Sequence, residues 1–421
     1  MPKKIQIFSL LIFQLFLITT LAAKVDINSD KQLKLESIGY PTKDYTLSAQ
    51  PIQEMKIFEN RLYLGFGDAT INTGPTDVLY YDLSSNTFEK EYTVQDEAIS
   101  QYCVVDGKLA ITGVDATEDW SYGNIYVKQD SGWVKHRTIP RGLHVFDLVE
   151  QDSLWYAGTG SVFELTGEQL YAFGGIFVSS DKGENWTLSY GTPSDANTVY
   201  RIKNLVMFQG GLYAFFYGYQ GMLEEDVPEK YRVDLGDTYQ DLHLIYNSDL
   251  LGSLDMLKYD KGAWSYLDAI PETDLISSTP IVFGDKMLLN TRAGKYIPAY
   301  GSRDRQVNNW YVYDGEKSEM VELPFANVQD WIITHDKLRM LVKKDKRYLL
   351  AETENLEDWE LKNIPDYLIP LSIEFQNGEY YLGAKNGLIY KTTGWEDLRE
   401  TKVNNNIHSF YYPWWGNEEF D

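Results

Sequence analysis

Three residues of this sequence, His144, Arg201 and Tyr217, have the side chains that a β-elimination on a sugar acid would need. A guanidinium or an imidazolium can neutralise the carboxylate of a uronic acid and so acidify the neighbouring C5 proton. A tyrosine or a histidine can then take that proton, and a tyrosine can donate one to the leaving oxygen. We treat these three as the candidate catalytic residues, on condition that the fold brings them to one sugar.

A second group of residues is rich in cations and aromatic rings, which indicates an anionic, sugar-like ligand. Guanidinium groups recognise carboxylates and sulfates through paired hydrogen bonds, and tyrosine and tryptophan rings stack on the faces of sugars. Arginines that only pair with surface acids are the alternative interpretation. The candidate substrate-binding residues are Asp68, Asn72, Asp115, Trp120, His136, Arg137, Tyr200, Arg292, Tyr296, Tyr300 and Arg303.

Metal chemistry has little support in the sequence. Asp68, Asp115, Glu118 and Asp119 could hold a Ca²⁺ ion, although their spacing is not that of an EF-hand, and solvated loop acids are the alternative. The only cysteine, Cys103, lies in a strand-like pattern and indicates a core residue rather than a zinc ligand. We therefore expect no required cofactor, with Ca²⁺ as an optional one.

The elements that would position these residues are repeats of a β-hairpin. A short apolar strand, a tight polar turn and a second apolar strand recur along the chain, and the turns carry Asn, Asp or Gly, which tolerate positive φ in two-residue hairpins. The spacing from Leu62 to its equivalent Leu109 is typical of four-stranded propeller blades. The repeats occupy residues 56–67, 103–114, 147–158, 205–216, 280–291, 331–342 and 372–383.

These repeats predict an all-β fold, a single seven-bladed β-propeller of four-stranded antiparallel blades. The apolar positions alternate with a period of two, which excludes a helical repeat. The segment 24–50 should lie outside the ring or lend a strand to the last blade, and the aromatic tail 403–421 should pack over a face or an edge. The expected blades span about 53–95, 96–140, 141–193, 194–271, 272–325, 326–365 and 366–402.

The links between the second and third strands are long in the first five repeats and short in the last two. The first link, 65–77, and the second, 112–123, both contain Asp-Ala-Thr, and Asp115 follows Asp68 at the offset that separates the two repeats. In a propeller these links share a face with the links that enter each blade. We expect them to form one wall of a ligand site on that face.

A motif at the edge of the third repeat carries a resemblance to a known group. Residues 179–186, Ser-Ser-Asp-Lys-Gly-Glu-Asn-Trp, match the Asp-box pattern S-x-D-x-G-x-x-W, and partial matches occur at 130–133, 260–264, 355–359 and 392–398. The chain therefore resembles the sialidase-like β-propellers. This resemblance implies the fold, and it implies that Asp181 and Trp186 are structural residues that cap an outer hairpin.

The residue types also make the chain similar to the seven-bladed ulvan lyases, secreted enzymes whose family mechanism uses His, Tyr and Arg. This similarity implies that His144, Tyr217 and Arg201 are catalytic and that the substrate is an acidic polysaccharide cleaved by β-elimination. We favour this function at the level of the sequence.

Two other functions stay open. A sialidase-like glycoside hydrolase would use Arg201, Arg292 and Arg303 as its arginine triad, with Asp68 or Asp115 as the acid. A propeller can also bind glycan or protein without catalysis, because a fold does not determine a function.

The N-terminus indicates the localisation of the protein, and the net charge indicates which partners are disfavoured. Lys3 and Lys4 precede a short apolar stretch that ends in small residues, so residues 1–23 are expected to be a signal peptide, and the protein to be secreted or periplasmic. No later segment is apolar enough to cross a bilayer. A net charge of −24 disfavours nucleic acid as a partner. A single cysteine allows no intramolecular disulfide, and we expect a monomer.

Overall fold

The computed structural model describes the greater part of the chain, and every regular element in that part is a β-strand. No helix in the described residues is long and apolar enough to cross a membrane. The described residues are 21–22, 24–71, 73–164, 170–192, 198–220, 256–267, 269–270, 274–276, 279–293, 309–325 and 327–397.

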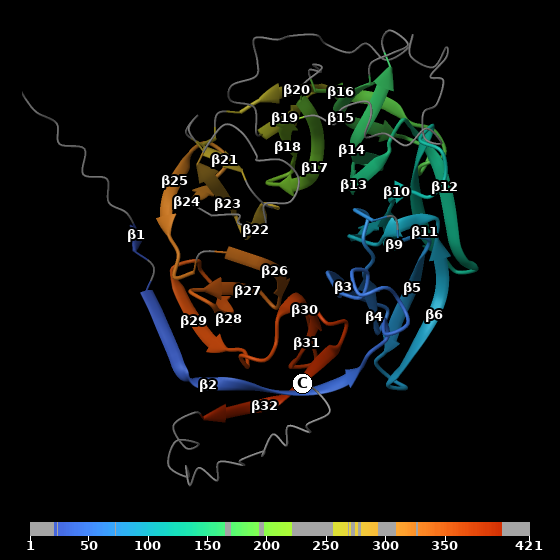
Figure 1. The fold of residues 1–421 in the computed structure, drawn as a ribbon. Helices are drawn as coiled ribbons and strands as arrows, with labels where there is room; N and C mark the ends of the chain where they lie inside the picture. Colours follow the sequence, from blue (N-terminus) through green and yellow to red (C-terminus); the bar gives the residue numbers. More distant parts are fainter. Residues whose placement is uncertain are drawn as a thin grey trace, which may run out of the picture.

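The strands form antiparallel meanders that follow one another around a common centre, as in a β-propeller (Figure 1). The first strands of the meanders, such as β3, β13, β17 and β26, lie near the centre, and the last strands lie at the rim. The tight turns occur where the sequence predicts them, because Asn60, Asp106 and Asn377 adopt positive φ angles of 62°, 52° and 53°.

The first four meanders hold the candidate site. The first contains β3 (Glu54–Phe58), β4 (Arg61–Gly65), β5 (Thr76–Asp82) and β6 (Thr87–Val94). The second contains β8 (Tyr102–Val105), β9 (Lys108–Thr112), β11 (Tyr122–Gln129) and β12 (Gly132–Pro140). The third contains β13 (His144–Gln151), β14 (Leu154–Glu164), β15 (Leu170–Ser179) and β16 (Thr187–Gly191), extended by β10 (Val114–Ala116) and β7 (Asp96–Ala98). The fourth contains β17 (Thr198–Phe208), β18 (Gly211–Gln220), β19 (Met256–Asp260) and β20 (Ala263–Tyr266).

The remaining strands complete the ring. One sheet contains β22 (Ile281–Phe283), β23 (Lys286–Ala293), β24 (Asn309–Tyr313) and β25 (Ser318–Glu322), with β21 (Asp274–Ile276) and β1 (Leu21–Ala22) added. The last sheet contains two meanders. They are β26 (Asn327–Thr334), β27 (Lys337–Lys344), β28 (Arg347–Thr353) and β29 (Asp358–Asn363), then β30 (Pro370–Gln376), β31 (Glu379–Ala384) and β32 (Ile389–Asp397).

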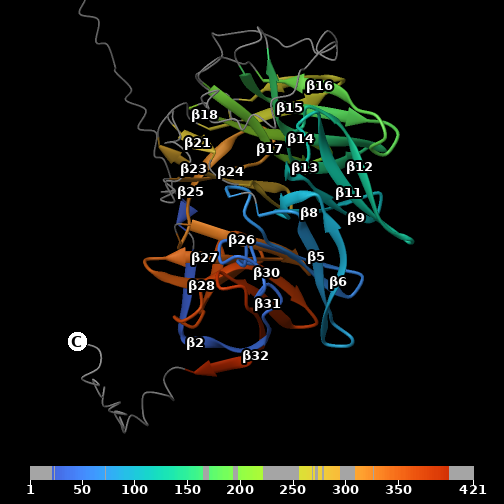
Figure 2. The same cartoon turned by 45° about the vertical axis from the view of Figure 1, so that its right-hand side comes forward.

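The described strands thus pair into six sheets, three of four strands, two of six and one of eight, rather than into seven separate four-stranded blades. The reason is β2 (Lys24–Gly39), which joins two meanders. Its first half pairs in parallel with β29, and its second half pairs antiparallel with β32 (Figures 1 and 2). The expectation that 24–50 lends a strand to the last repeat is confirmed. Leu33 on β2 is 1% exposed and packs into the apolar cluster between these two meanders. The strand β2 therefore connects the last two meanders of the ring.

Apolar clusters fill the spaces between successive meanders. Val105, Ile125 and Val145 lie in one cluster between the second and third meanders, and the others repeat this arrangement around the ring. The cluster that contains Leu62 and Tyr381 joins the first meander to the last. Because the ring has no disulfides, burial of this apolar surface is what stabilises its closed form.

Buried carboxylates also connect the innermost strands of neighbouring meanders through hydrogen bonds. Asp147 on β13 accepts hydrogen bonds from the N–H groups of Leu148 and of Leu205 on β17, both at 2.8 Å. Asp330 on β26 does the same with Trp331 and with Ile373 on β30. Each aspartate ends a β-bulge, which turns its side chain toward the next meander. Burial raises the pKa of Asp147 to about 6 and that of Asp330 to about 7.

The turn at 179–186 is closed by its own side chains. Asp181 accepts hydrogen bonds from the backbone and the side-chain amide of Asn185, which lower its pKa to about 2. The Nε1–H of buried Trp186 donates to the carbonyl of Gly183, which has a φ of 90°. A shorter turn ends at Trp359, whose Nε1–H donates to the carbonyl of Leu356. All these bonds lie within the hairpins that they cap.

Candidate functional site

Two short strands bring the links of the first two meanders to the start of β13. β10 pairs with β13 through Val114 and His144, and β7 pairs with β10 on its other side. The first link, 65–77, joins this arrangement through a bridge between Gly67 and Ala98. The two links that share the Asp-Ala-Thr sequence therefore lead to the strand that begins with His144.

His144 and Asp115 form a buried pair at this point. The Nδ1 of His144 lies 2.7 Å from the Oδ1 of Asp115, and His144 is 7% exposed. Burial lowers the pKa of His144, and the positive charge of Arg201 lowers it further, against the opposing effect of Asp115. The imidazole is therefore neutral at neutral pH. Since Nδ1 faces a carboxylate, the tautomer with the proton on Nδ1 is favoured, and this tautomer leaves the lone pair on Nε2.

Gly160 allows the side chains of His144 and Arg201 to come together. Gly160 pairs with His144 in β14, and a Cβ atom at Gly160 would lie 3.2 Å both from the Cδ2 of His144 and from the Cγ of Arg201. These two side-chain atoms are thus no further apart than twice that distance. Two of the three candidate catalytic residues lie close enough to act on one sugar ring.

An aromatic ring and a second cation complete the cluster. The ring of Phe146 stacks on His144 with 5.3 Å between centroids. The guanidinium of Arg201 lies 5.4 Å from the centre of the Phe146 ring, and the ammonium of Lys203 lies 5.1 Å from it. This cluster, His144, Phe146, Arg201 and Lys203 with Asp115, combines a neutral base with two positive charges.

The third candidate, Tyr217, lies on the neighbouring strand. Its backbone pairs with Arg201 across β17 and β18. Tyr200, next to Arg201, is 6% exposed and packs with Tyr156 and Ile202 in the apolar cluster between the third and fourth meanders. Alternation along a strand explains the difference, since Arg201 and Tyr200 point to opposite sides.

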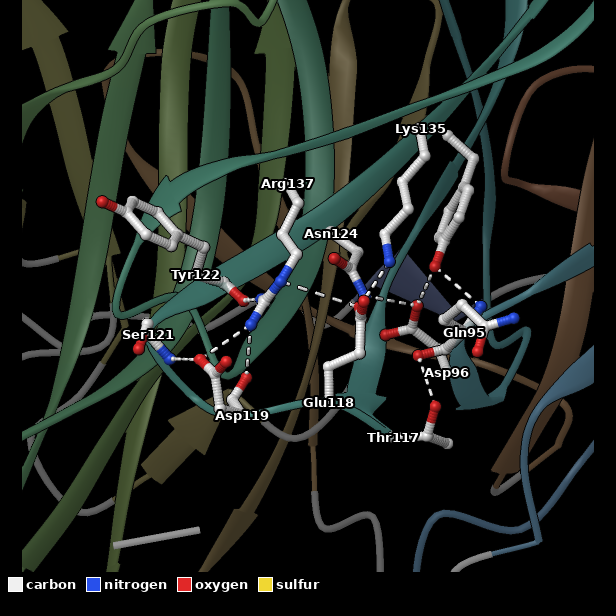
Figure 3. A network of polar contacts seen from close by, with 11 residues as sticks. Gln95, Asp96, Thr117, Glu118, Asp119, Ser121, Tyr122, Asn124, Lys135 and Arg137 are labelled. Atoms are coloured by element: carbon white, nitrogen blue, oxygen red, sulfur yellow. Dashed lines mark hydrogen bonds and ion pairs between the residues drawn. The ribbon is translucent and has the colours of Figure 1, made fainter. Parts of the chain in front are cut away.

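Most other candidate binding residues already have partners in the chain. The carboxylate of Asp68 accepts hydrogen bonds from Thr70 in its own turn. Arg137 donates to Asp119 and to the carbonyl of Tyr122, and it also faces Glu118 (Figure 3). These bonds match the alternative that some of the arginines pair with surface acids.

The remaining candidate residues are partly outside the described residues. The Nδ1 of His136 lies 3.5 Å from the Oε1 of Glu184. Trp120 lies half-buried in the turn between β10 and β11. Arg292 pairs through its backbone with Leu275. Asn72, Tyr296, Tyr300 and Arg303 lie outside the described residues.

The four loop acids considered for Ca²⁺ have separate partners. Asp115 faces His144, Glu118 pairs with Lys135, Asp119 pairs with Arg137, and Asp68 closes its own turn. No group of three or more His, Cys, Asp or Glu side chains in the described part of the chain is arranged to hold a metal ion.

Sequence reasoning missed Phe146, Lys203 and the role of Gly160. A signal for the first two was available, because each follows a candidate residue by two positions in an expected strand and so shares its side. The pairing of Asp115 with His144 had no such signal, since it depends on a strand pair between two links.

Comparisons with known proteins identify no relative by sequence. No family model and no curated protein matches the chain. Among solved structures it is similar to a catalytically inactive variant of virginiamycin B lyase from Staphylococcus aureus with quinupristin, with 10% identity, a TM-score of 0.48, and coverage of 86% of this chain and 99% of that one. It is also similar to a polysaccharide lyase of family PL25, an ulvan lyase, with 10% identity, a TM-score of 0.47, and coverage of 91% and 98%.

A third similar structure is the β-propeller domain of the trilobed protease from Pyrococcus furiosus, with 12% identity, a TM-score of 0.43, and coverage of 84% of this chain and 96% of that one. Identities and TM-scores this low transfer neither an activity nor a residue role to this chain.

Proposed function

We propose that this protein is a polysaccharide lyase that cleaves an acidic polysaccharide by β-elimination at a uronic acid. The observation that carries the proposal is the neutral, buried His144, held by Asp115 and placed beside Arg201. A neutral imidazole next to a guanidinium is suited to removing a proton from a carbon adjacent to a carboxylate, because the base is ready and the carboxylate charge is neutralised.

Each residue has a defined role in the proposed reaction. Arg201, with Lys203 beside it, binds the uronate carboxylate. The Nε2 of His144 takes the C5 proton, and Asp115 holds the imidazole and stabilises its positive charge. The C4–O bond then breaks, a C4=C5 double bond forms, and the leaving oxygen takes a proton from Tyr217. The proton removed and the proton donated balance, so the reaction needs no water.

We propose that the scaffold is a seven-bladed propeller, secreted or periplasmic after removal of residues 1–23, that acts as a monomer. Seven apolar clusters between successive meanders, counted among the described residues, support the blade number. A propeller that only binds an acidic glycan is the alternative, and the cations around Phe146 would serve it equally well.

The test is ultraviolet absorbance over time with a panel of uronate polymers that includes ulvan. A lyase generates an unsaturated uronate, which absorbs, whereas a hydrolase yields reducing ends without this absorbance. We expect His144→Ala and Arg201→Ala to abolish the signal, since loss of a general base alone costs about 10²–10⁴-fold. The matched control is His335→Asn, because His335 is an exposed residue of the turn between β26 and β27, away from the cluster. Binding without absorbance would favour the non-catalytic alternative.

A further inference from the structure

A buried carboxylate lies behind the His144–Asp115 pair. Asp96 on β7 is 1% exposed, and its Oδ2 accepts hydrogen bonds from the hydroxyl of Tyr126 at 2.6 Å and the side-chain amide of Asn124 at 2.9 Å. The same hydroxyl accepts a bond from the backbone N–H of Gln95 (Figure 3). Three links thus fix β7 to β11 of the second meander.

The other oxygen of Asp96 packs against the backbone that leads to Asp115. A Cβ atom at Gly113 would lie 2.5 Å from the Oδ1 of Asp96, so this oxygen lies directly over the glycine. The carbonyl of Gly113 in turn accepts a hydrogen bond of 2.8 Å from the N–H of Val145, the residue after His144. Asp96 therefore packs against Gly113, which is itself hydrogen-bonded to the strand that carries His144.

β7 also holds β10 by its backbone. Asp96 pairs with Ala116 and Ala98 pairs with Val114, so the two residues that flank Asp115 are both bound to β7. Asp115 itself has a φ of 57°, a conformation that non-glycine residues adopt at a cost. Such a conformation persists only where its surroundings impose it, and β7, which pairs on both sides of Asp115, and β13 are the strands paired with β10.

We propose that Asp96 is a positioning residue that holds Asp115 against His144. The inference rests on the proposed function for its consequence in catalysis, but the placement itself needs no substrate to be tested. Asp96 does not face the ligand. It acts through β10, and its bonds to Tyr126 and Asn124 keep that strand at the distance from β13 that the His144–Asp115 contact requires.

The pKa of His144 reports the position of Asp115 directly. The charged groups that affect His144 are Asp115, which raises its pKa, and Arg201 and Lys203, which lower it. If Asp115 moves away, the pKa of His144 must fall. Near Asp96 itself, Lys135 favours the ionised carboxylate and Glu118 opposes it.

The experiment is a histidine NMR titration of the full chain with isotope-labelled histidine. The chain has five histidines, so His144→Gln identifies the signal. Asp115→Asn should lower the pKa of His144 by about one unit or more and sets the scale. Asp96→Ala should give at least about half of that shift, in the same direction.

The matched control is Glu91→Gln. Glu91 on β6 accepts hydrogen bonds from Tyr63 of the first meander and from Trp133 of the second, and its loss should leave the titration of His144 unchanged. If Asp96→Ala does not fold, Tyr126→Phe removes one donor from Asp96 with less damage and should shift the titration in the same direction. A folded Asp96 or Tyr126 variant with the wild-type titration would overturn the inference. A chain without lyase activity in which the shift occurs would instead refute the proposed function alone.

Discussion

Replacing Asp147 with asparagine should flatten the pH dependence of unfolding between about pH 4 and pH 7. Burial raises the pKa of Asp147 from 3.8 to about 6 in the folded protein. Between these values the folded protein binds more protons than the unfolded chain, so its stability falls as the pH rises. One pKa unit corresponds to about 1.4 kcal/mol, and this group alone therefore accounts for a fall of about 3 kcal/mol.

The assay is urea unfolding of wild type and Asp147→Asn at a series of pH values from mildly acidic to neutral. The variant loses the acceptor for the N–H of Leu205 and is less stable than wild type at acidic pH. Between pH 4 and pH 7, the free energy of unfolding of the variant should nevertheless fall by up to about 3 kcal/mol less than that of wild type. Parallel curves for the two proteins would refute the reasoning, because they would show that Asp147 does not change its protonation differently on unfolding.

Three further predictions concern the strand contacts and the cluster. In urea unfolding, Leu33→Ala should lower the free energy of unfolding by about 2–5 kcal/mol, since Leu33 is the buried apolar residue of β2, whereas Lys34→Ala at the exposed neighbour should not. Equal free energies of unfolding for the two variants would mean that β2 does not close the ring. Gly160→Ala places a methyl group against His144 and Arg201 and should reduce lyase activity at least about tenfold, and urea unfolding of the same variant checks that the fold is intact. Unchanged activity would show that Gly160 is not part of the site. The kcat/KM of the lyase should fall as the pH drops below the lowered pKa of His144 and stay level above it, and a profile that instead rises toward acid would contradict a histidine base.

The repeats of the ring could be predicted from the sequence because local chemistry encodes them. Alternating apolar residues and turn residues such as Asn60 and Asp106 determine strands and hairpins over a few positions, and the structure has them where they were expected. Strand pairs between distant segments were harder to predict. The pairing of β2 with β32 was among the expectations, but its parallel pairing with β29, which merges two meanders into one sheet, has no local pattern in 24–39 that encodes it.

The main residues of the candidate site could be predicted from the sequence, but the residues that position them could not. His144 and Arg201 were found because they lie near the starts of expected innermost strands, and the structure places them together. Tyr200 was assigned to the ligand but packs in an apolar cluster, because a strand alternates its sides. No local pattern marks Asp96 as part of the site, since its burial depends on Tyr126 and Asn124 from another strand.

The most direct test of the central claim is the rate of double-bond formation on a uronate polymer deuterated at C5. If His144 removes that proton, the ultraviolet signal should appear more slowly with the deuterated polymer than with the ordinary one, and His144→Gln should abolish it for both. Reducing ends that form without ultraviolet absorbance, or a signal that survives in His144→Gln, would contradict the proposed β-elimination at this site.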